Sequence, residues 1–212
     1  LFFSEVGDRA LIEKTTKGTS AWNLEISGPG KMQVLGNSLF VLERHTIYLG
    51  DENIVRLDLS TMKPERIFPE LRNGITQLLA LNDGKTLAFN ELKSQQVLLL
   101  NTENPASKPQ AVQIASSYPR ALGQWRNCLL VASEDNHQLS FVAPNQKTPT
   151  VLGEVSLEGY KDELPNIRNL TVNPETGAIF LRSSRVPRLW EPQNGKNSVY
   201  RFTHSYWTSQ CE

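Results

Sequence analysis

The sequence predicts an all-β fold built from repeated antiparallel hairpins. The first observation is a repeat of about 45 residues, which occurs at 75–91, 119–134 and 167–183 and, in a looser copy, at 31–43. The second is the layout of each copy, in which two short apolar runs flank a turn rich in Asn, Asp, Gly or Pro. A fixed period of this length is typical of propellers and solenoids.

The two inner strands of each copy are expected to form a hairpin. Apolar residues at 78–81 meet the turn Asn82-Asp83-Gly84, and a second apolar run follows at 87–89. The last copy repeats this layout at 170–172 and 179–181. Asn, Asp and Gly tolerate positive φ, so the chain can reverse direction between the two runs.

Two further strands are expected in each copy. The third has apolar residues at every second position, as at 55–59 and 139–143, which is typical of a strand with one buried face. The fourth, at 111–114 and 151–155, is weaker and suits an outer edge, where polar residues and Pro are tolerated. Four antiparallel strands per repeat make one blade of a β-propeller.

The segment 83–91 (DGKTLAFNE), followed by 96–102 (QVLLLNT), resembles the repeat of the YVTN family of β-propellers, a group that includes lactonase-like propellers. Segments 118–134 and 172–180 are similar to the same repeat. The resemblance covers residues 31–204 and implies a propeller, but one such fold hosts many unrelated activities. The second strand departs from the usual aromatic-Val-Ala-Asn core in every copy.

Residues 1–212 are expected to form a single propeller domain. In this division 31–204 hold the four repeats, 1–30 supply closing strands and 205–212 form a tail. Ring closure normally needs N-terminal strands that complete a blade begun at the C-terminus, because an open ring exposes unpaired edges. The expectation is therefore about five blades. The alternative is part of a larger ring, whose missing blades come from an absent segment or a second chain.

Composition narrows the range of partners. Lys plus Arg number 22 and Asp plus Glu number 22, so no overall field would draw the chain to nucleic acid. No apolar run in the sequence approaches the roughly 20 residues that a membrane-spanning helix needs. We therefore expect neither a nucleic-acid partner nor a membrane-spanning segment.

The cysteines bear on the compartment. Cys128 and Cys211 either form one disulfide in an oxidising compartment or remain a buried thiol and a tail thiol, and the sequence leaves both readings open. The chain begins at Leu1 rather than at Met, so we expect a processed or trimmed product. The compartment is not fixed, although an extracytoplasmic location, periplasmic or secreted, is favoured.

Motifs that announce catalytic or metal chemistry are absent from the sequence. It has no HExxH pair, no Gly-x-Ser-x-Gly elbow and no complete phosphate or dinucleotide loop. We therefore expect no catalytic residue, no metal site and no cofactor.

One constellation comes from aligning the repeats. Arg120 and Arg168 occupy equivalent positions in the segments that enter the innermost strands, with Thr76 and Met32 in the other two copies. The resemblance implies that these segments face a central channel, where two guanidinium groups could bind one small anion. The alternative is that each Arg pairs with a nearby acid. Candidate acids are Glu91, Glu134 and Glu163.

A long loop offers a second candidate site. Segment 185–192 carries Arg188, Leu189 and Trp190 between prolines, and it is long for a compact repeat. Trp and Arg are frequent at the energetic centres of protein interfaces. We expect this loop to contact a partner protein; the alternative is that it folds onto its own blade.

Three functions follow from these features. We expect a non-enzymatic binding module or assembly scaffold that contacts another protein, because no catalytic signature occurs and a long loop does. The resemblance permits the alternative of a lactonase-like hydrolase that acts on a small anionic substrate at the central channel. The third reading is a propeller that holds a small anion without chemistry.

Overall fold

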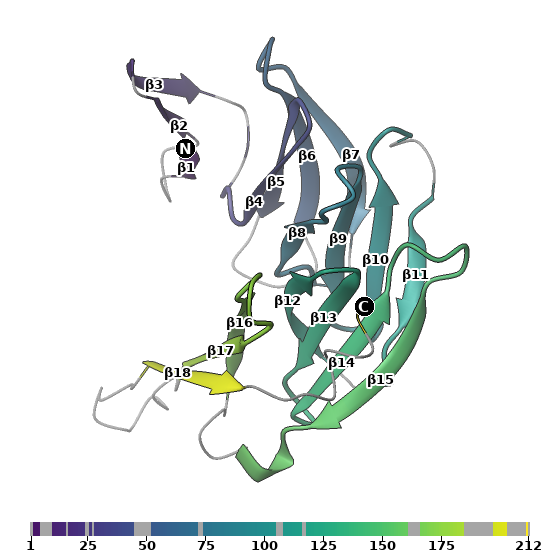
Figure 1. The fold of residues 1–212 in the computed structure, drawn as a ribbon. Helices are drawn as coiled ribbons and strands as arrows, with labels where there is room; N and C mark the ends of the chain where they lie inside the picture. The colour runs from purple at the N-terminus through teal and green to yellow at the C-terminus, as the bar shows by residue number, and fades with distance from the viewer. Residues whose placement is uncertain are drawn as a thin grey trace.

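The computed structural model describes most of the chain as five antiparallel sheets, named blades 1 to 5 in chain order (Figure 1). The described residues are 2–4, 10–15, 17–23, 26, 28–44, 52–71, 74–104, 108–115, 118–160, 166–184, 197–202 and 211.

Each blade consists of strands that are consecutive in the chain. Blade 1 contains β1 (Phe2–Ser4), β2 (Ala10–Thr15) and β3 (Gly18–Asn23). Blade 2 contains β4 (Met32–Leu35), β5 (Ser38–Arg44), β6 (Glu52–Asp58) and β7 (Pro64–Leu71). Blade 3 contains β8 (Leu78–Ala80), β9 (Thr86–Glu91), β10 (Gln96–Asn101) and β11 (Gln110–Gln113). Blade 4 contains β12 (Pro119–Trp125), β13 (Cys128–Ser133), β14 (Gln138–Ala143) and β15 (Thr150–Ser156). Blade 5 contains β16 (Ile167–Val172), β17 (Ile179–Ser184) and β18 (Asn197–Phe202).

This architecture confirms the predicted all-β fold. Blades 2, 3 and 4 have four strands each, and every strand pairs antiparallel with its neighbour in sequence. The helical content of the described residues is one 3₁₀ turn, Glu158–Tyr160. Within the same residues, no helix is long and apolar enough to cross a membrane.

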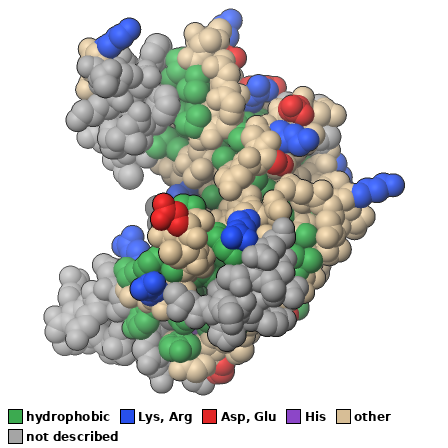
Figure 2. Space-filling view, viewed as in Figure 1, with side chains coloured by type: hydrophobic (Ala, Val, Ile, Leu, Met, Phe, Trp, Pro, Cys, Tyr) green, Lys and Arg blue, Asp and Glu red, His purple; other side chains and the backbone are tan. Residues whose placement is uncertain are grey.

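The N-terminal strands form a sheet of their own. Strands β1, β2 and β3 pair with one another, and no described strand pairs with the outer side of β18. The five blades follow one another along an arc that has blades 1 and 5 at its ends (Figure 1). Figure 2 shows the molecule hollowed on the side where the arc is open. The assignment of 1–30 as closing strands and the single domain 1–212 therefore both stay predictions.

Local hydrogen bonds explain why the predicted turns form. Asp83 accepts two backbone N–H bonds, of 3.0 and 2.8 Å, in the turn between β8 and β9. Asn173 accepts two such bonds, both of 2.9 Å, in the turn between β16 and β17. Gly84 and Gly177 take φ values of +75° and +69° in these turns, a region that a residue without Cβ enters freely.

The apolar core lies between the blades. Phe40 and Phe89 pack between blades 2 and 3, Val131 lies between blades 3 and 4, and Phe141 and Leu181 lie between blades 4 and 5. The second strand of each central blade is buried along most of its length, because both of its faces meet a neighbouring sheet.

The two cysteines are bonded to each other. Cys128 and Cys211 form a disulfide with a Cα–Cα distance of 5.3 Å across 83 residues of chain. Both are buried in the core between blades 4 and 5. The bond ties residue 211 to the first residue of β13 and decides between the two readings that the sequence leaves open.

Strand register defines equivalent positions in four blades. The equivalent inner-strand residues are Met32, Leu78, Leu122 and Leu170, which pair with Val41, Phe89, Val131 and Leu181 respectively. Phe89, Val131 and Leu181 pack toward the preceding blade, and Val41 shares a cluster with Ile26, which precedes blade 2. This register provides a common frame for comparing residues at the blade ends.

Candidate functional site

The predicted ligand residues lie where the chain enters the inner strands. We call this end of the propeller the entry face. Thr76, Arg120 and Arg168 each stand two residues before the register-equivalent leucine of β8, β12 and β16, so their predicted equivalence is confirmed. In blade 2 that position belongs to Gly30, because Met32 itself pairs within the strand. The placement of Met32 was wrong by two residues, a slip that leaves alternating apolar residues on the same face.

Arg120 is engaged by a carboxylate of its own blade. Its Nε lies 3.3 Å from Glu134 Oε2, and the two side chains are 17% and 19% exposed. The backbone N–H of Glu134 also donates to the carbonyl of Tyr118 at 3.1 Å. The pair therefore fastens the start of β12 to the end of β13. A small anion would compete with Glu134, and anion binding by Arg120 and Arg168 stays a prediction.

Thr76 belongs to a hydrogen-bond network centred on Asn90. The Asn90 side chain is fully buried, and its Oδ1 accepts the backbone N–H groups of Thr76 (3.1 Å) and Gln77 (2.8 Å). Its Nδ2 donates to Thr76 Oγ1 at 2.9 Å and to the carbonyl of Pro119, in the next blade, at 2.6 Å. The role of Asn90 could not be predicted from the sequence, because Asn90 looks there like any other residue of a predicted strand.

A longer link joins blades that are not neighbours in sequence. Gln77 Nε2 donates to the carbonyl of Arg168 at 3.1 Å, across 91 residues of chain. This bond connects the entry segments of blades 3 and 5. Thr76, Arg120 and Arg168 thus belong to entry segments that are joined by polar contacts.

Tyr118 is an exposed aromatic residue of the entry face. It precedes β12, 43% of the residue is exposed, and its φ is +56°. Bulky residues are rarely found at positive φ. In the sequence, Tyr118 stands out only as part of the repeat pattern.

The predicted partner residues Arg188, Leu189 and Trp190 lie outside the described residues. Their segment follows Ser184, the last residue of β17. Because Ser183 pairs with Ile167, β17 ends at the same side of blade 5 where β16 begins. The described chain therefore approaches the segment 185–196 from the entry face.

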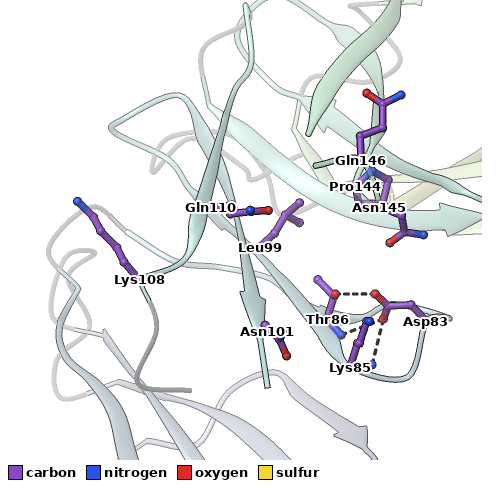
Figure 3. Close-up of a pocket in the computed structure, with 10 residues that line it drawn as sticks. All are labelled: Asp83, Lys85, Thr86, Leu99, Asn101, Lys108, Gln110, Pro144, Asn145 and Gln146. Atoms are coloured by element: carbon purple, nitrogen blue, oxygen red, sulfur yellow. Dashed lines mark hydrogen bonds between the residues drawn. The ribbon is translucent and has the colours of Figure 1, made fainter. Parts of the chain in front are cut away.

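A cavity of about 550 Å³ lies elsewhere, between blades 3 and 4 and beside the turns at 83–86 and 144–146 (Figure 3). Its lining is mostly polar and includes Lys85, Asn101 and Asn145, but none of Thr76, Arg120 or Arg168. Asp83, at its edge, points into its own turn in Figure 3. Partial burial opposes ionisation of Asp83, but hydrogen bonds from Thr86 and Lys85 outweigh it and hold its pKa below the ordinary value.

The described residues contain no group of three His, Cys, Asp or Glu side chains that could hold a metal ion. His137 lies in the turn before β14, where its carbonyl accepts the backbone N–H of Leu157.

Antiparallel blades, arranged along an arc and joined at the ends of their inner strands, define a β-propeller. No protein-family model matches the chain, and no curated protein matches it. Among solved structures it is similar to the hydrazine synthase of Kuenenia stuttgartiensis, with a TM-score of 0.70 and 16% identity over 97% of this chain.

Two further solved propellers are similar. Virginiamycin B lyase from Staphylococcus aureus gives a TM-score of 0.65 at 10% identity over 96% of this chain. A chain of a nidogen/laminin complex gives 0.60 at 10% identity over 92% of this chain and 76% of its own length. This chain spans 60% of the hydrazine synthase chain and 66% of the lyase chain. At such identities the likeness shows the fold alone.

Proposed function

We propose that this chain is a non-enzymatic binding module or assembly scaffold that contacts another protein through its entry face. The observation that carries the proposal is the bond from Gln77 Nε2 to the carbonyl of Arg168, which joins the entry segments of blades 3 and 5. Small-molecule sites are concave and partly apolar. Entry segments that are bonded to one another offer a continuous surface, which suits a protein partner.

Side-chain types on this face support the proposal. Tyr118 is exposed there, and Arg120 is fixed beside it in the chain by Glu134. Tyr, Trp and Arg dominate the energetic centres of protein interfaces. The predicted contact residues Arg188, Leu189 and Trp190 belong to the segment that β17 leads into on this side.

The test begins with partners that co-purify with the chain from its native source, followed by titration calorimetry with the purified partner. Trp190→Ala should weaken binding by about 2 kcal/mol if Trp190 is a hot spot. Val199→Ala is the matched control, because Val199 is an exposed apolar residue on the outer strand β18. Equal affinity of both variants and the parent would remove Trp190 from the contact.

The second candidate function is a lactonase-like hydrolase that acts on a small anionic substrate held by Arg120, Arg168 and Thr76. It is favoured by the similar structures that are themselves enzymes, namely virginiamycin B lyase and a luciferin-regenerating enzyme. The resemblance of the repeat to that of the YVTN family, which includes lactonase-like propellers, also supports the hydrolase. Turnover of a panel of lactones that disappears in the Arg120→Gln/Arg168→Gln variant would favour the hydrolase over the binding module.

The same variant tests the third reading, in which the propeller holds an anion without chemistry. Binding of a small carboxylate, measured at low salt, should be lost when both arginines are replaced, because exposed charges are least screened there. Unchanged binding would exclude an anion site at these residues.

A further inference from the structure

Blade 5 has one face toward blade 4 and one face away from it. Leu181 of β17 packs in the core that the two blades share. Successive side chains of a strand point to opposite faces, so Phe180 and Arg182 point away from blade 4. Phe180 pairs with Arg201 of β18, and Arg182 pairs with Val199 of the same strand. Paired residues share a face of a sheet, so these four form one surface, which we call the open face of blade 5.

The open face is exposed and carries two arginines. Of Val199, 67% is exposed, and Arg182 and Arg201 are exposed as well. Figure 2 shows Lys or Arg side chains over blade 5, beside the hollow on the open side of the arc. In the part of the chain that the structure describes, neither the Arg182 nor the Arg201 guanidinium makes a hydrogen bond or an ion pair.

The corresponding face of blade 4 is covered by blade 5 and is apolar. Ala132 and Phe141 stand there at the positions that Arg182 and Arg201 occupy in blade 5. Both are buried in the core between the two blades. Blade 5 therefore presents two charges where a covered blade presents apolar side chains.

Covered blades have polar residues at these positions only with hydrogen-bond partners. In blade 3, Asn90 stands at the position of Arg182, and it bonds within its own blade and to a backbone carbonyl of blade 4. In blade 2, Arg56 stands at the position of Arg201, and its Nε donates to Ser38 Oγ at 2.9 Å. Covering an unpaired charge costs far more than covering a bonded polar group. Anything that covers the open face must therefore bring acceptors for two guanidinium groups.

The register also sets the spacing of those acceptors. Arg182 and Arg201 are diagonal neighbours on adjacent strands, a relation in which residues lie about 7–8 Å apart. In an extended chain, residues i and i+2 share a face and lie about 7 Å apart. Carboxylates accept the paired N–H groups of a guanidinium well. An extended segment with a carboxylate at every second position therefore fits the two arginines.

We propose that the open face of blade 5 binds an extended acidic peptide segment, whose carboxylates two residues apart face Arg182 and Arg201. Charge complementarity and the matching spacing favour this occupant over an apolar blade, which would leave both charges buried and unpaired. The surface lies on the side of blade 5 rather than at its entry face. The inference therefore does not rest on the proposed function.

The first test uses a fluorescein-labelled peptide of sequence Glu-Thr-Glu-Thr-Glu-Thr, with binding followed by fluorescence anisotropy at low salt, where exposed charges are least screened. The parent should bind this peptide at least about 10-fold more tightly than the matched Gln-Thr-Gln-Thr-Gln-Thr peptide. Inorganic phosphate is the competitor. Equal binding of both peptides, or displacement by phosphate at the concentration of the acidic peptide itself, would overturn the proposal.

The second test removes the two arginines. Arg182→Gln/Arg201→Gln should weaken binding of the acidic peptide by about 10-fold and should melt as the parent does, because both side chains are exposed. Lys63→Gln/Lys147→Gln is the matched control, since it removes two exposed charges from turns of blades 2 and 4. The control should bind as the parent does. Equal losses in both double variants would mean a general attraction between charges and no site on blade 5.

A second copy of the chain is the competing occupant of the open face. Sedimentation of the parent without peptide should show no self-association that depends on the two arginines. A dimer that disappears in the Arg182→Gln/Arg201→Gln variant would assign the face to contact between copies, and the acidic-peptide site would be wrong.

Discussion

The junction between blades 3 and 4 and the junction between blades 4 and 5 use the same strand position in opposite ways. Asn90 follows Phe89 in blade 3, and Ala132 follows Val131 in blade 4, so the two are equivalent in register. Asn90 reaches the next blade with a hydrogen bond to Pro119. Ala132 instead belongs to an apolar cluster shared with Leu170 and Leu181 of blade 5.

The two junctions differ in more than this residue. Blades 3 and 4 are also joined by the N–H of Asn82, which donates to Gln124 Oε1 at 2.7 Å. Blades 4 and 5 are held by close packing of β12 on β16, and the disulfide lies in their shared core, where it ties residue 211 to β13. Both junctions therefore have an apolar core, and they differ in what is added to it: directional polar bonds between blades 3 and 4, and a disulfide in the core of blades 4 and 5.

Removing the disulfide should have the largest effect. Cys128→Ala/Cys211→Ala frees a loop of 83 residues, which in the chain-entropy model costs about 4.5 kcal/mol of unfolding free energy. Urea denaturation of the parent, the double variant and the reduced parent measures this loss of unfolding free energy. Reduction should not weaken the double variant further. If all of them unfold at the same urea concentration, the covalent tie contributes nothing to the junction between blades 4 and 5.

Overpacking the junction between blades 4 and 5 should have the second-largest effect on stability. A Cβ added at Gly123 would lie 2.0 Å from Leu170 Cδ2. Gly123→Ala should therefore cost about 3 kcal/mol, since a close-packed core has no room for the methyl group. Thermal or urea unfolding gives the value.

A double-mutant cycle gives the control. Leu170→Ala alone should cost about 2–5 kcal/mol, but together with Gly123→Ala it makes space for the new methyl group. The cost of the pair should then be well below the sum of the single costs. Additive costs would mean that these two residues do not meet.

The sequence predicted what is encoded locally and missed what joins the blades. Asp83 and Asn173 mark their turns because an Asx side chain binds the backbone two and three residues on. The pairing of Cys128 with Cys211 stayed open because sequence spacing does not determine which residues meet in space. Asn90 and Arg182 were hidden because their roles appear only when register aligns one blade with the next.

Removing Asn90, the centre of the polar contacts between blades 3 and 4, should lower the unfolding free energy somewhat less than Gly123→Ala does. Asn90→Ala leaves two backbone N–H groups and the carbonyl of Pro119 without their buried partner. An unsatisfied buried group costs about 1–3 kcal/mol, and partial relaxation should bring the total to about 2 kcal/mol. Ala132→Gly at the equivalent position is the control, and it should cost about 1.5 kcal/mol through strand entropy and the loss of one buried methyl group. Equal losses would contradict the contrast between the junctions.

The smallest effect on stability is expected from changes in the hairpin turns beside the blade junctions. Asp83 shapes the turn that carries Asn82, the second polar tie between blades 3 and 4. Its pKa is lowered below the ordinary value of 3.8, because hydrogen bonds from Thr86 and Lys85 outweigh partial burial. A lowered pKa means that the stability is complete above the ordinary value and is lost as the pH falls through the folded-state value.

Asp83→Ala should therefore cost about 1 kcal/mol near pH 6, and this cost should shrink as urea unfolding is repeated toward pH 3. Asn173→Ala is the matched change, because Asn173 makes the same pair of backbone bonds in blade 5 without a charge. Its cost should be the same at both pH values. A pH-independent cost at Asp83 would mean that the carboxylate charge adds nothing to the turn, so that the polar contacts between blades 3 and 4 depend only on neutral hydrogen bonds.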